Sequence, residues 1–139
     1  MTEYHTTRKV SVPPDSVWAV LADHEGMPRW TASRSAHLER IGDQDRNGVG
    51  AIRALGTPVG RIREEITEFD APNRLVYRML SGAPVRDYVG TVRLSPDGAG
   101  TLIEWSVSFV PRLPGVQLVI KALIGQLATG LAKESARRG

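Results

Sequence analysis

The spacing of apolar residues changes near Pro111 of this 139-residue chain, and that change limits the folds open to it. From about residue 33 to Pro111 apolar residues tend to recur at every second position, which is the period of a strand with one buried face. The clearest case places Ile103, Trp105 and Val107 between the polar residues Glu104 and Ser106. After Pro111 the period becomes helical, and apolar residues follow each other at intervals of three and four. The sequence therefore predicts a run of strands followed by one long helix, at about 115–136.

Turn-forming residues divide the first of these regions into short strands. Segments rich in Gly, Pro, Asp and Asn separate the expected strands, and such short connections favour antiparallel neighbours. We expect strands at residues 35–41, 49–55, 59–69, 75–80, 86–94 and 101–110.

The first thirty residues add a strand and two short helices. Thr and Val at 4–12 favour a strand, and Pro14 with Asp15 favours a helix start near residue 13. That helix should end by Gly26, and residues 27–30 should form a short second helix or turn. We therefore predict an α+β fold in one domain, 1–139, with a seven-stranded antiparallel sheet wrapped around a long C-terminal helix and two short helices after the first strand.

Composition excludes several classes of protein. The chain has no Cys, which excludes disulfides, Cys-ligated metals and thiol nucleophiles. The net charge of +3 comes from scattered basic residues, so we do not expect a nucleic-acid partner. The first nine residues lack an apolar stretch, and the apolar run at 116–124 is too short to cross a bilayer, so we expect a cytoplasmic protein with no membrane span.

A single sheet with one apolar face needs a cover, and the C-terminal helix is the only predicted element long enough. A twisted sheet wrapped around one helix tends to leave a gap, which would make a mostly apolar small-molecule site. The alternative is that the same side chains fill a solid core. The side chains expected at the gap are Tyr77, Met79, Tyr88, Trp105, Val107, Leu123 and Leu127.

The order of elements, together with several short segments, resembles the SRPBCC superfamily, which has the START-like helix-grip fold and includes the polyketide cyclase/dehydrase and lipid-transport group. The similarity covers nearly the whole chain and is carried by the order and spacing of the segments. It implies a cavity for a hydrophobic ligand between the sheet and the C-terminal helix. The segments are 13–21 (PPDSVWAVL), Trp30, 47–53 (NGVGAIR), 64–77 (EEITEFDAPNRLVY), Asp87-Tyr88 and 100–105 (GTLIEW).

The resemblance also implies that Arg53 and Glu64 point inward. The two-residue alternation of a strand agrees with an inward position for Glu64, which lies between Ile62 and Ile66 on one face. A turn at 56–58 would bring Arg53 near Glu64 on the neighbouring strand. Such a pair could orient a ligand carbonyl or hydroxyl, or it could be an ion pair that only joins two strands. With Trp30 and Ile66, these residues complete the expected ligand-binding set.

Other catalytic patterns are not convincing. Gly48 and Gly50 lack the third glycine of a dinucleotide loop, so we expect no cofactor. His5, His24 and His37 lack the spacing of metal ligands, and we expect surface or loop positions for them and no metal. Of the three, His24 is the one that could face the cavity mouth, but the sequence shows no partner for it.

Three functions remain open. The first is binding or transport of a small hydrophobic molecule, such as a lipid or polycyclic aromatic compound. The second is a polyketide cyclase or dehydratase that uses Arg53, Glu64 and Tyr88. The third is a structural or regulatory partner protein. The chain could be a monomer or a homodimer through a sheet edge.

Overall fold

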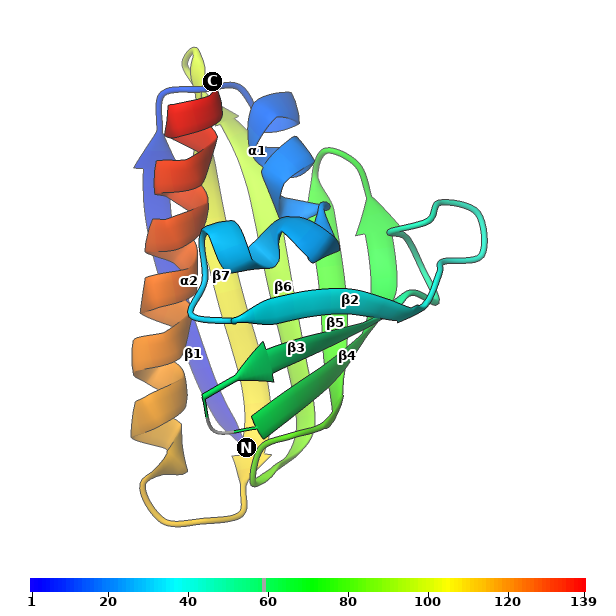
Figure 1. Ribbon diagram of the computed structural model, residues 1–139. Helices are drawn as coiled ribbons and strands as arrows, with labels where there is room; N and C mark the ends of the chain where they lie inside the picture. The colour runs from blue at the N-terminus through cyan, green and yellow to red at the C-terminus, as the bar shows by residue number, and fades with distance from the viewer. Residues whose placement is uncertain (59) are drawn as a thin grey trace.

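The computed structural model describes residues 1–58 and 60–139, and it has the predicted order of elements (Figure 1). Val59, the first residue of one expected strand, lies outside the described residues. The elements are β1 (Thr2–Val10), α1 (Pro14–Leu21), the 3-10 helix η1 (His24–Arg29), β2 (Ser35–Arg40), β3 (Ile52–Thr57), β4 (Gly60–Asp70), β5 (Arg74–Ser81), β6 (Val85–Asp97), β7 (Gly100–Pro111) and α2 (Val116–Arg138).

The strands form one antiparallel sheet in the order β1-β7-β6-β5-β4-β3-β2. Strands β2 to β6 each pair with the next strand along the chain, while β1 pairs with β7, and α2 runs alongside these two strands (Figure 1). This is the helix-grip architecture, and the predicted fold class is confirmed. The structure differs mainly at the ends of elements. Strand β6 continues to Asp97, where turn residues predicted an earlier end, because Pro96 and Asp97 still pair with Thr101 and Gly100.

The core lies between the concave face of the sheet and α2. Ile103, Trp105 and Val107 of β7 are buried, as their alternation predicted, and Tyr88 and Val92 of β6 are buried beside them. The helix contributes buried residues at intervals of three and four: Ile120, Ile124, Ala128 and Leu131.

One end of the concave face is closed by α1, which lies near the C-terminus of α2, and η1 continues from it across the face beside β2 (Figure 1). Val17 and Leu21 of α1 and Met27 of η1 are buried there, and the rings of Trp18 and Phe69 meet edge to face with centroids 5.1 Å apart. The opposite end has no helix of this kind and is bounded by strand connections and the start of α2 (Figure 1).

Helix α2 is longer than its apolar run alone suggested. At 23 residues it is long and apolar enough to cross a membrane by length and composition. Its buried apolar residues belong to the same core as the sheet, whereas Leu118 and Val119 are each 66% exposed, so packing explains only part of its apolar composition.

Two glycines of α2 allow a matched test of this packing. An added Cβ at Gly130 would clash with the backbone carbonyl oxygen of Trp30, whereas the nearest atom at Gly125 would be Arg8 Nη2 at 3.7 Å. Gly125→Ala should therefore stabilise the protein by about 0.5–1 kcal/mol, the gain in helix propensity. Gly130→Ala should destabilise it by about 1–3 kcal/mol, because α2 must move away from η1. Urea denaturation of both variants checks this, and a stabilised Gly130→Ala protein would contradict the close contact.

Candidate functional site

The β3–β4 hairpin brings Arg53 and Glu64 together on the concave face. The two residues are directly paired in the strand register. Arg53 Nε donates to Glu64 Oε1 at 2.9 Å, and Arg53 Nη2 lies 2.8 Å from the same oxygen. Both side chains are buried, with 3% and 8% of their surface exposed. The expected proximity of Arg53 and Glu64 is confirmed.

His24 is a third member of this cluster, and the expectation of a surface or loop position for it was wrong. It is the first residue of η1, and its side chain is fully buried. The Nε2–H group donates to the carbonyl oxygen of Asn47 at 2.8 Å, so Nδ1 is free to accept from Arg53 Nη1 at 3.1 Å. His24 therefore holds the Arg53 guanidinium from the side opposite Glu64.

The hydrogen bonds of His24 require a neutral imidazole. Burial and the neighbouring Arg53 charge lower the pKa of His24 from 6.5 to about 3, although the hydrogen bond to Asn47 opposes this shift. No sequence pattern links residues 24, 47 and 53. Only the docking of η1 onto the hairpin brings them together.

Aromatic side chains of β5, β6 and β7 surround the cluster. The Arg53 guanidinium carbon lies 4.8 Å from the centroid of the Tyr77 ring, and Trp105 Nε1 donates to the Tyr77 hydroxyl at 3.2 Å. The Tyr77 ring lies so close to Gly90 that an added Cβ there would clash with it. Burial raises the pKa of Tyr77, and the Glu64 carboxylate raises it further, so the hydroxyl keeps its proton.

Tyr88 brings a second protonated hydroxyl. Its ring stacks on Phe109 with centroids 5.7 Å apart, and it lies 6.3 Å from the ring of Tyr77. Burial is the largest cause that raises the pKa of Tyr88, followed by the nearby Tyr77 and Glu64.

Trp30 carries a buried donor without a partner. Its ring meets Trp105 edge to face at 6.4 Å, and its Nε1 has no hydrogen bond within the described part of the chain. A buried N–H group without an acceptor costs about 1–3 kcal/mol, so this indole would gain from an acceptor supplied by a bound molecule.

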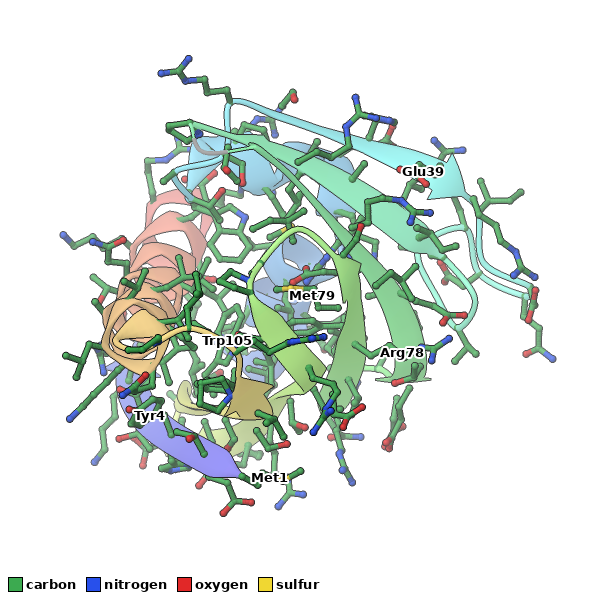
Figure 2. All side chains as sticks on the ribbon, turned by 90° about the horizontal axis from the view of Figure 1, so that it is seen from below. Met1, Tyr4, Glu39, Arg78, Met79 and Trp105 are labelled. Carbon is green, nitrogen blue, oxygen red and sulfur yellow. The ribbon has the colours of Figure 1, made fainter. Side chains whose placement is uncertain are left out.

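The expected ligand-binding residues fall into two groups by burial. Trp30, Arg53, Glu64, Ile66, Tyr77, Tyr88, Trp105 and Val107 are buried, whereas Met79, Leu123 and Leu127 are half-buried. Figure 2 shows Met79 and Trp105 inside the space between α2 and the sheet, while Arg78 and Glu39 lie on the outside. We call the half-buried group Met79, Leu123 and Leu127 the apolar rim.

Two hollows on the surface lie away from this cluster. One, of about 380 Å³, is lined by strands β1, β6 and β7 and includes His5, Thr91 and Ser106. The other, of about 470 Å³, follows α2 between Arg8 and Lys133. Of the expected ligand-binding residues, Val107 alone lines either hollow. Across residues 1–58 and 60–139, no three His, Asp or Glu side chains are grouped as metal ligands would be.

Comparison with known families gives the same assignment as the fold. A family model described as "Polyketide cyclase / dehydrase and lipid transport" matches residues 1–137. The chain belongs to this family. Because the family's description joins cyclases, dehydrases and lipid transport, membership supports ligand binding or cyclase/dehydrase chemistry without choosing between them.

Solved structures share the fold at low sequence identity. The Zhui aromatase/cyclase from Streptomyces sp. R1128 has a TM-score of 0.83 and 21% identity, over 99% of this chain and 94% of that one. A START superfamily protein from Mycobacterium smegmatis has a TM-score of 0.78 and 16% identity, over 98% and 95% of the two chains. Ara h 8.0201 has a TM-score of 0.77 and 16% identity, over 96% and 97%. No curated protein matches the sequence at a significant level.

Proposed function

We propose that this family member binds, and in the cytoplasm carries, a small hydrophobic molecule between the concave face of the sheet and α2. The observation that carries the proposal is the buried cluster of Arg53, Glu64 and His24 on an otherwise apolar face. An apolar site with a few convergent polar groups is the usual form of a small-molecule site.

We place the entry route at the apolar rim, away from the end of the concave face that α1 covers. Met79 and Leu127 pack against the core while keeping part of their surface exposed. Methionine is unbranched and adapts its shape readily, so Met79 can move aside at low cost. A ligand that enters past the apolar rim reaches Glu64 directly, because Met79 is the register partner of Glu64 on the neighbouring strand.

Blocking this route should weaken binding. Met79→Trp puts a larger, stiffer side chain inside the rim, and we expect it to raise the dissociation constant for any ligand of the native protein at least about tenfold. Leu80→Trp is the matched control, because Leu80 is the next residue of β5 and is exposed. Native mass spectrometry against a panel of fatty alcohols and polycyclic aromatic compounds measures both. The proposal fails if the native protein binds nothing in the panel, or if both variants bind as it does.

The protonated hydroxyls near Glu64 favour a second candidate function, that of a polyketide cyclase or dehydratase. A Glu64 oxygen would remove a proton next to a ligand carbonyl while the Tyr88 hydroxyl exchanges its hydrogen bond with Tyr77 for one to the carbonyl oxygen, with Arg53 holding the carboxylate in place. Turnover of a poly-β-ketone substrate that is lost in Tyr88→Phe, with ligand binding retained, would support the enzyme. Binding without turnover would favour the carrier function over the enzyme.

A further inference from the structure

The cluster beneath the apolar rim carries no net charge. The guanidinium of Arg53 is neutralised by the Glu64 carboxylate, and the hydrogen bonds of His24 hold its ring neutral. The one other buried charged side chain among the described residues is Glu134. It lies towards the C-terminal end of α2 and pairs with Arg137 at 2.7 Å and Arg138 at 2.9 Å. A ligand beside Glu64 therefore meets no uncompensated buried cation, and the half-buried Arg8 of β1 is hydrogen-bonded to neutral groups of β1 and α2.

The free hydrogen-bonding positions of the cluster are those of a neutral polar site. Both short contacts from Arg53 go to Glu64 Oε1, so Oε2 has no hydrogen-bond partner among the described residues and can accept from a ligand hydroxyl. The Tyr88 hydroxyl is hydrogen-bonded to that of Tyr77, which also accepts from Trp105 Nε1, so the buried donor left without an acceptor is the Trp30 indole N–H. A ligand hydroxyl and a ligand carbonyl would both find partners here.

A ligand carboxylate would be disfavoured at the same place. It would lose its hydration and lie close to Glu64, whose negative charge Arg53 compensates but does not exceed. From the charge and hydrogen-bonding pattern we infer that the site selects uncharged ligands bearing a hydroxyl or carbonyl group over the same skeleton bearing a carboxylate. This inference rests on the proposed function and specifies its ligand class.

Two probes with one ring system test the inference. At pH 7, 2-naphthol is neutral and 2-naphthoate is an anion, while their apolar surfaces are nearly equal. We expect the native protein to bind 2-naphthol at least about tenfold more tightly than 2-naphthoate, measured by titration calorimetry. Equal affinities, or tighter binding of the naphthoate, would overturn the inference while leaving the proposed binding function in place. Binding of neither probe would also overturn it, and the broader ligand panel then decides the proposed function separately.

Glu64→Gln tests whether Glu64 sets this preference. The substitution keeps the shape of the side chain but leaves the Arg53 charge uncompensated, so the preference for 2-naphthol should disappear or reverse. Glu65→Gln is the matched control, because Glu65 pairs at 2.6 Å with Arg78 on the outside of the sheet. The control should keep the native preference, and a preference unchanged in Glu64→Gln would overturn the assignment to Glu64.

A measurement on the native protein avoids any problem with folding of the Glu64 variant. If the hydroxyl of bound 2-naphthol lies near the Glu64 carboxylate, its pKa is raised in the complex. The absorbance change that marks ionisation should then occur at a higher pH for bound than for free 2-naphthol. A titration that moves to lower pH would show a cationic site and overturn the inference.

Discussion

Replacing Arg53 with methionine should lower the free energy of unfolding by about 3–5 kcal/mol, because it leaves the buried Glu64 carboxylate without its counter-charge. His24 would also lose the donor to its Nδ1 atom. The same reasoning applies to Arg53→Leu, so a loss of activity in either variant would not by itself identify Arg53 as catalytic. Equilibrium urea denaturation measures the effect.

The double variant Arg53→Met/Glu64→Leu should recover most of that loss, because replacing a whole buried ion pair with apolar residues is often nearly neutral. Arg78→Met is the exposed control: Arg78 pairs with Glu65 at 2.6 Å, but 56% of its side chain is exposed, and such pairs contribute about 0–1 kcal/mol. If Arg53→Met cost no more than Arg78→Met, the buried pair would not have the importance assigned to it.

Acidification should destabilise the protein well before most carboxylates titrate, because of His24. The pKa of His24 is about 3 in the folded protein, against an ordinary value of 6.5. Between these values the unfolded chain binds a proton that the folded protein does not, so stability falls as the pH falls. The expected loss is about 1.4 kcal/mol per pH unit, or about 4 kcal/mol between pH 6.5 and pH 3.5.

The window from pH 6.5 to pH 5 separates His24 from the carboxylates. Over this range the native protein should lose about 2 kcal/mol, whereas His24→Gln, which cannot take up a proton, should show a flatter profile. His37→Gln, at an exposed position on β2, is the control and should keep the native slope. Denaturation curves at several pH values measure all three. Parallel profiles for the native protein and His24→Gln would show that His24 is not held neutral.

The proximity of Arg53 and Glu64 was predictable because it depends on local features. A short connection places the two residues on neighbouring strands, but the exact pairing did not follow from the expected turn. A turn at 56–58 would set Arg53 opposite Arg61, whereas the structure pairs Thr57 with Gly60 and therefore Arg53 with Glu64. The burial of Tyr88, Trp105 and Val107 follows from alternation.

The partners of His24 and the donor of Trp30 could not be predicted in this way. His24 touches Arg53 and the backbone of Asn47 because η1 docks against the hairpin, and the carbonyl of Asn47 belongs to a connection with no regular period. Every residue has a backbone carbonyl, so a hydrogen bond to one cannot be predicted from the residue types. The expected gap likewise depended on side-chain volumes in three dimensions, and the two hollows described above lie elsewhere.

By itself the sequence determined the elements, their antiparallel order and the helix that covers the sheet, because hydrophobic period and turn residues act over a few neighbouring positions. Only the tertiary structure decided that His24 joins the Arg53–Glu64 pair and that the resulting cluster has no net charge. The reason is physical: burial and the charge of a residue distant in sequence set the protonation state of a side chain, and both exist only once the chain has folded.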